Sequence, residues 1–192
     1  MKVLLIDNSD LFTSSLIHEF EKRDCEVAVL KNNADLKSVD SALKKSKISL
    51  IVISPGPGNV ENSGNSVNIV RTYAGKMPIF GVGLGQQCII TAFEGAVSKS
   101  AVSHGKIGKI THDSKTIFRK VANPFSAGIY SSMFASDVPY SLEVSARDEY
   151  DHVMGVRHKE YFVEGVQFHP DSLLTVYGSM ILDNLLDEVR RR

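Results

Sequence analysis

Short apolar runs alternate with helix-like patterns along the first half of the chain. The apolar runs predict buried strands at residues 3–6, 26–30, 48–53 and 78–82. Apolar residues at helical spacing predict helices at residues 14–23, 35–45, 65–74 and 86–94. Strands that are separated by helices favour a parallel sheet with helices on both faces, because each crossover helix packs back onto the sheet.

The second half of the chain changes to short strands separated by turns. Its pattern predicts strands at residues 107–111, 140–145, 153–157 and 161–166, and a closing helix at residues 173–190. In that helix we expect five apolar side chains to face the core: Leu174, Met180, Ile181, Leu185 and Leu186. The chain of 192 residues is long enough for one α/β domain with a full core.

Composition disfavours several classes of function. Charged residues make up 23% of the chain and the net charge is zero, so neither nucleic acid nor a membrane is expected as a partner. The two cysteines, Cys25 and Cys88, argue against a disulfide framework and are typical of a cytoplasmic protein. No apolar run approaches the length of a signal peptide or a membrane span. The histidines lack the spacing of metal ligands, so no metal is expected.

The segment FGVGLGQQ at residues 80–87 is the most informative part of the chain. A strand that ends in Gly-x-X-x-Gly and turns into a helix is the frame of a nucleophile elbow, which holds a strained central residue over the sheet edge. The central residue here is Gly83, which has no side chain. The frame for a nucleophile is therefore present and the nucleophile is absent. Cys88 is expected to lie inside the following helix, where a buried cysteine is usually a core residue.

Three other motifs have polar or glycine-rich character at strand ends. The loop SPGPG at residues 54–58 can direct backbone N–H groups at an oxyanion, and a simple turn is an equal alternative. The loop HGK at residues 104–106 is more simply explained as solvated. The segment GVQFHPD at residues 165–171 places an acid two residues after a histidine, as in the base half of a catalytic triad.

Together these motifs resemble the class I glutamine amidotransferases, and most closely the small subunit of anthranilate synthase and its aminodeoxychorismate synthase relative. The family motifs DNxDSFT, SPGPG, HGK and QFHPES match residues 7–13, 54–58, 104–106 and 167–172. The resemblance covers nearly the whole chain. It implies a single amidotransferase domain over residues 1–192, with a flavodoxin-like α/β fold. In that fold a mostly parallel central sheet has helices on both faces, and a small antiparallel sheet is added.

The resemblance also implies a reaction and a partner. Family members hydrolyse glutamine with a Cys-His-Glu triad and pass ammonia to a synthase that holds chorismate. On this chain the triad positions are those of Gly83, His169 and Asp171. The oxyanion donors are expected near Gly56 and Leu84, and glutamine is expected at Gln87 and at the backbone of Ser132 and Met133. The synthase large subunit, of the anthranilate synthase component I type, is expected at His104, Gly105 and Lys106, and no cofactor is implied.

The chain departs from the family pattern at four places. Gly83 replaces the Cys, Gln86 and Ser131 each replace a His, and Asp171 replaces the triad Glu. Changes at four positions around one pocket favour natural drift after loss of glutaminase activity, so the first hypothesis is a non-catalytic subunit that stabilises or regulates a synthase using free ammonia. Two alternatives remain open at this point. One is an active enzyme whose Cys was replaced artificially, and the other is a binding module that senses glutamine.

Overall fold

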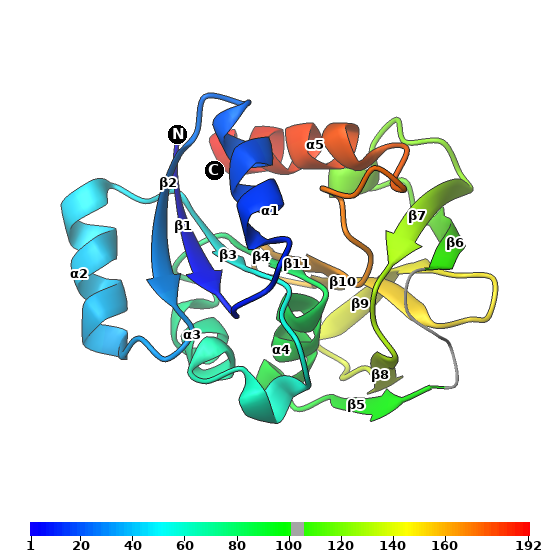
Figure 1. Ribbon diagram of the computed structural model, residues 1–192, viewed down its shortest axis with the longest axis horizontal. Helices are drawn as coiled ribbons and strands as arrows, with labels where there is room; N and C mark the ends of the chain where they lie inside the picture. The colour runs from blue at the N-terminus through cyan, green and yellow to red at the C-terminus, as the bar shows by residue number, and fades with distance from the viewer. Residues whose placement is uncertain (101–105) are drawn as a thin grey trace.

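The computed structural model describes residues 1–100 and 106–192 (Figure 1). Among these residues, the strands of the large sheet are β1 (Lys2–Asp7), β2 (Glu26–Lys31), β3 (Leu50–Ile53), β4 (Ile79–Val82), β6 (Lys106–His112), β7 (Phe125–Ile129), β9 (Leu142–Arg147), β10 (Val153–His158) and β11 (Val163–Val166). Their order is β2-β1-β3-β4-β11-β10-β9-β6-β7. A separate antiparallel sheet consists of β5 (Ala96–Lys99) and β8 (Met133–Asp137).

The large sheet is parallel in one half and antiparallel in the other. From β2 to β11 each strand is parallel to its neighbour, and from β11 to β7 each pair is antiparallel. The change falls at β11, whose carboxyl end leads to His169. The site residues that follow β3, β4 and β11 therefore meet at one edge of the parallel half, where ligands bind in open α/β sheets.

Helices cover both faces of the parallel half. They are α1 (Thr13–Glu21), α2 (Leu36–Ser46), α3 (Ser66–Tyr73), α4 (Leu84–Ala92) and α5 (Gly178–Arg190), with short 3-10 turns at η1 (Val60–Asn62) and η2 (Thr116–Phe118). Adjacent residues of β1 enter opposite cores: Leu5 packs with Phe20 of α1 and Leu182 of α5, whereas Leu4 packs in the core that contains Ile89 of α4. This arrangement confirms the predicted α/β fold, including the small additional antiparallel sheet (Figure 1).

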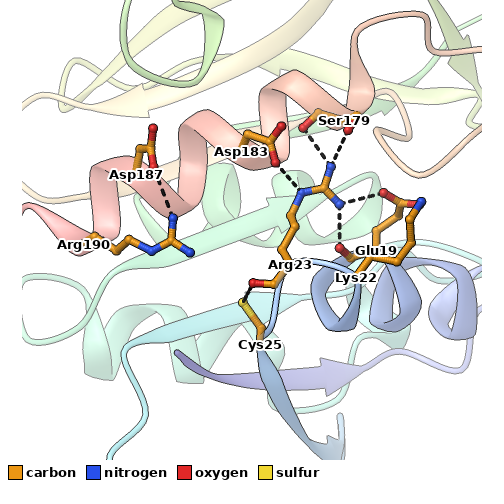
Figure 2. A network of polar contacts seen from close by, with 8 residues as sticks. All are labelled: Glu19, Lys22, Arg23, Cys25, Ser179, Asp183, Asp187 and Arg190. Carbon is orange, nitrogen blue, oxygen red and sulfur yellow. Dashed lines mark hydrogen bonds and ion pairs between the residues drawn. The ribbon is translucent and has the colours of Figure 1, made fainter.

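Arg23 ties the end of α1 to the start of α5 (Figure 2). Its Nε donates to Asp183 Oδ1 at 2.7 Å, and its Nη2 donates to the hydroxyl and the carbonyl of Ser179 at 2.6 and 3.0 Å. Its Nη1 donates to Glu19 Oε2 at 2.8 Å. Because the guanidinium donates to acceptors on both α1 and α5, it fixes the relative position of these two helices, which cover one face of the sheet.

The closing helix begins at Gly178 and not at residue 173 as the periodicity predicted. In the preceding loop, Thr175 Oγ1 donates to the His169 carbonyl at 2.6 Å. The residues between His169 and Gly178 therefore form turns, and the helix begins only after them. The expectation that Leu174 and Met180 face the core was wrong, because both side chains are exposed. Three other predicted core residues are buried as expected: Ile181, Leu185 and Leu186.

Candidate active site

The turn between β4 and α4 is made by one residue, Gly83. Its backbone angles are φ 57° and ψ −112°, which residues with a side chain adopt only under strain. The glycines on either side allow close packing: a Cβ at Gly81 would lie 2.5 Å from the Gly85 carbonyl, and a Cβ at Gly85 would overlap the Ile53 carbonyl. The local geometry is that of a nucleophile elbow.

The space above Gly83 is open and faces a histidine. A Cβ at this position would lie 3.4 Å from His169 Nε2 and 3.4 Å from Pro55 Cβ, which are ordinary van der Waals separations. A nucleophilic side chain built on this Cβ would be next to the imidazole, as a nucleophile must be next to its base. The fold has therefore kept the position of a nucleophile without the nucleophile.

His169 lies in a largely apolar cage. The rings of Phe12 and Tyr130 lie 5.3 and 4.9 Å from its own, both edge to face. Burial lowers the pKa of His169 to about 4, so the imidazole is neutral at neutral pH. The sequence analysis did not predict this cage, although Phe12 and Tyr130 each lie in a segment that matches a family motif.

Asp171 does not complete a hydrogen bond to His169. Its Oδ1 lies 3.8 Å from His169 Nδ1, within reach for an ion pair but too long for a hydrogen bond. No ion pair forms at neutral pH, because the imidazole is neutral there. Burial raises the pKa of Asp171 to about 6, and neither of its carboxyl oxygens has a hydrogen-bond partner among the described residues. A carboxylate one methylene shorter than the family glutamate therefore falls short of the imidazole.

A cavity of about 160 Å³ opens beside Gly83. Its size is below the roughly 300–1,000 Å³ of drug-sized pockets, so it suits a ligand no larger than an amino acid. It brings together most of the predicted site residues: Gly56, Gly83, Leu84, Gln87, Ser132, Met133 and His169. The two predicted oxyanion positions adjoin each other, because a Cβ at Gly56 would lie 2.8 Å from Leu84 Cδ2.

Ser131 and Gln87 use the backbone groups of Met133. Ser131 Oγ accepts from the Met133 N–H at 3.0 Å and donates to the Met133 carbonyl at 3.1 Å. Gln87 Nε2 donates to the same carbonyl at 3.1 Å. Both backbone groups of Met133 thus have partners within the chain, in the segment where contact with glutamine was expected.

Gln86 lies away from the cavity, which corrects the expectation that all four departures surround one pocket. Its side chain is buried between α4 and the sheet, where Nε2 donates to the Val153 carbonyl at 3.4 Å. A Cβ at Gly165 of β11 would lie 3.1 Å from Gln86 Cα, so the helix approaches the sheet closely here. Successive helix residues point about 100° apart, so Gln86 faces the sheet while Gln87 faces the cavity.

Cys88 cannot replace the missing nucleophile. It is buried in α4, and burial raises the pKa of its thiol to about 12. A reactive cysteine needs exposure and a lowered pKa, and Cys88 has neither.

Of the three residues predicted to contact the synthase, only one belongs to the part of the chain that the structure describes. His104 and Gly105 lie outside the described residues, and Lys106 begins β6. Across residues 1–100 and 106–192, no group of three or more His, Cys, Asp and Glu side chains is placed to hold a metal ion. Within the same ranges, no helix combines the length and apolar character that a membrane span requires.

Comparison with known proteins agrees with this geometry. The chain matches the profile of the family described as glutamine amidotransferase class-I over residues 4–189. The chain belongs to this family. Aminodeoxychorismate synthase component 2 of Escherichia coli (strain K12) is 42% identical over 187 residues, covering 96% of this chain and 98% of that protein. Anthranilate synthase component 2 of Methanocaldococcus jannaschii is 42% identical over 176 residues, covering 91% of this chain and 86% of that protein.

A solved structure supports the fold. A protein from Thermoplasma acidophilum that is named as a GMP synthase subunit superposes with a TM-score of 0.88 at 22% identity, covering 100% of this chain and 94% of that one. At this identity the match shows the fold alone. The sequence relatives place this amidotransferase among the subunits of the anthranilate and aminodeoxychorismate synthase type.

The chemistry open to this amidotransferase follows from its residues. Neutral His169 presents Nε2 toward position 83 and has the protonation state of a general base. Gly56 and Leu84, the residues predicted to supply oxyanion donors, line the same cavity. Gly83 has no side chain, so position 83 supplies no side-chain nucleophile next to His169.

Proposed function

We propose that this chain is a glutamine amidotransferase subunit of the anthranilate synthase component 2 type that does not hydrolyse glutamine. The observation that carries the proposal is the elbow at Gly83, where the backbone keeps the strained geometry of a nucleophile position and no side chain is present. Triad members act as a unit, so loss of the nucleophile removes most of the catalytic rate. Buried Cys88 offers no substitute.

Two further departures support natural drift over a single lesion. Asp171 leaves a gap of 3.8 Å to His169 Nδ1, so the imidazole lacks the hydrogen bond that would orient it. Ser131 occupies both backbone groups of Met133, which lines the cavity. An enzyme that had lost only its thiol would have no reason to change these two positions. Gln86 supports neither natural drift nor a single lesion, because it lies outside the cavity.

The proposed partner is a chorismate-using synthase of the anthranilate synthase component I type, which would use free ammonia. Two exposed apolar side chains are offered in support of a docking surface: Leu11, which lies between the cavity-lining residues Asp10 and Phe12, is 94% exposed, and Leu173 is 103% exposed. Ser15 at the start of α1 donates from Oγ to the Asp171 carbonyl at 3.4 Å, so the helix that follows Leu11 contacts the segment that precedes Leu173. Exposed apolar side chains that lie together on a surface are typical of interaction sites. His104, Gly105 and Lys106 remain proposed contacts of the synthase because they match the family motif HGK.

The first test is ammonia release from glutamine by the purified chain, alone and with the chorismate-using synthase of the same organism. We expect no release above buffer in either case, and we expect the complex to make anthranilate from ammonium salts. Release at an ordinary enzymatic rate would contradict the loss of glutaminase activity. If the complex makes aminodeoxychorismate and no anthranilate, the partner belongs to the alternative pathway.

The second test is complex formation by gel filtration. The chain and the synthase are expected to elute together, and Leu173→Asp is expected to separate them. Val29→Asp is a matched control, because Val29 is an exposed apolar residue on β2, away from the cavity. Separate elution of the unchanged proteins would refute the partnership. Calorimetry with glutamine covers the alternative of a glutamine sensor, for which a measurable affinity is required.

A further inference from the structure

A second group of catalytic-type side chains lies outside the cavity. Ser100 Oγ lies 3.0 Å from His152 Nε2, and His152 Nδ1 lies 2.9 Å from Asp148 Oδ2. Ser100 directly follows β5, whereas Asp148 and His152 belong to the connection between β9 and β10. Both distances are those of hydrogen bonds, and the order of groups is that of a serine nucleophile, a base and an orienting acid.

The protons of this group are placed as a general base requires. Asp148 Oδ1 accepts the backbone N–H groups of Tyr150 at 3.0 Å and of His152 at 2.8 Å, so the carboxyl group acts as an acceptor. Its Oδ2 then accepts the Nδ1–H of His152. In the neutral imidazole that carries its proton on Nδ1, Nε2 presents a lone pair, to which the hydroxyl of Ser100 can donate across the 3.0 Å between them.

Packing holds the three side chains in place. The ring of Phe134 stacks on the His152 ring at 4.3 Å with an angle of 24° between the planes. The side chain of Asp148 is 1% exposed, and that of His152 is 19% exposed. The backbone N–H of Ser100 donates to the Ser132 carbonyl at 2.8 Å. Ser100 itself is half-buried, so its hydroxyl is partly open to solvent.

We propose that Ser100 is a base-activated nucleophile that accepts acyl or phosphonyl groups from small activated esters and fluorides. In the first step Ser100 Oγ forms a bond to the carbonyl carbon and transfers its proton to His152 Nε2. The carbon–oxygen bond to a phenolate leaving group then breaks, and the protonated His152 releases its proton to the phenolate or to solvent. With a fluorophosphonate, Ser100 Oγ forms its bond to phosphorus, the phosphorus–fluorine bond breaks, fluoride leaves, and His152 passes the serine proton to solvent. Water, deprotonated by His152, attacks the acyl-serine, which releases the carboxylic acid and restores the hydroxyl.

The structure also limits the rate and the substrate class. The N–H of Ser100 is already bonded to the Ser132 carbonyl, so it does not serve as an oxyanion donor. The acceleration then comes mainly from the base, which contributes about 10²–10⁴-fold. Such a centre acts on esters with good leaving groups and not on amides. It is independent of the elbow at Gly83 and of the proposed function.

The test is covalent labelling with a fluorophosphonate, followed by peptide mapping, together with hydrolysis of p-nitrophenyl acetate. In the unchanged chain we expect Ser100 to be labelled at least about 100-fold faster than Ser98, the lower end of general-base acceleration. Ser98 is a matched control because it is exposed on β5 and two residues away. His152→Gln is expected to reduce labelling of Ser100 to the rate of Ser98, and Ser100→Ala is expected to reduce ester hydrolysis.

The comparison of Ser100 with Ser98 needs no variant, so it decides the question even if His152→Gln does not fold. Equal labelling of the two serines would overturn the proposal and leave the group as a structural tie between β5 and the β9–β10 connection. Labelling of Ser100 that persists unchanged in a folded His152→Gln chain would also overturn it. Thermal unfolding of each variant establishes that it is folded.

Discussion

Replacement of Gly83 by alanine isolates the strain of the elbow. A Cβ at this position meets no atom closer than 3.4 Å, so the methyl group causes no overlap. The cost then comes from the backbone at φ 57° and ψ −112°, and such strain is about 1–3 kcal/mol. Alanine also reduces the conformational freedom of the unfolded chain, which offsets about 0.4–1 kcal/mol. We expect a net loss of about 0–2.6 kcal/mol in the free energy of unfolding.

The assay is urea unfolding followed by circular dichroism, with thermal unfolding beside it. For a chain of this size the expected loss lowers the melting temperature by up to about 10 °C. Gly85→Ala is the control for overlap, because its Cβ would collide with the Ile53 carbonyl, and we expect it to lose far more stability or not to fold. If Gly83→Ala costs as much as Gly85→Ala, the space above Gly83 is not open. If it stabilises the chain, the elbow is not strained.

Three other predictions concern the titrating and nucleophilic groups of the site. Gly83→Cys alone is expected to release ammonia from glutamine near the background rate. Adding Asp171→Glu is expected to raise that rate, because one more methylene extends the carboxylate by about 1.5 Å across the 3.8 Å gap to His169. Strong activity of the single variant would show that only the thiol was missing. The pKa of His169 is lowered to about 4, so between that pH and 6.5 the unfolded chain binds a proton there that the folded chain does not, and this residue makes stability rise with pH. The pKa of Asp171 is raised to about 6, so between 3.8 and that pH the folded chain keeps a proton that the unfolded chain loses, and this residue makes stability fall with pH. Each effect is about 3 kcal/mol. Relative to the unchanged chain, Asp171→Asn should make the free energy of unfolding rise more steeply from pH 4 to 6.5, and His169→Asn should make it rise less steeply. The same pH dependence of the free energy of unfolding in both variants, measured by urea unfolding, would contradict this. Cys88 is expected to react with a thiol reagent only on unfolding, because its thiol is buried with a pKa of about 12. Cys25 is also free, so the labelled residue is identified by peptide mapping, and rapid labelling of Cys88 in the native chain would show that α4 opens.

Local pattern was sufficient for most of the elements in the parallel half. The apolar runs that became β1, β3 and β4 are short and uninterrupted, as expected of strands buried on both faces. The strands missed from the sequence were β5, β7 and β8. Of these, β5 and β8 are largely exposed and show no apolar alternation, so only their pairing with each other defines them as strands. The start of α5 was misplaced because the turns around His169 overrode a helical apolar spacing.

The sequence by itself determined the family, the α/β fold and the absence of a nucleophile at position 83. These are local properties, because a glycine-framed turn between a strand and a helix and a residue without a side chain are both visible in the order of residues. Only the tertiary structure decided that Gln87 faces the cavity while Gln86 faces the sheet, and that Asp171 stops 3.8 Å from His169 Nδ1. It alone brought Ser100 within 3.0 Å of His152, 52 residues further along the chain. Such distances depend on how the strands and helices pack against each other, and no local pattern of residues encodes them.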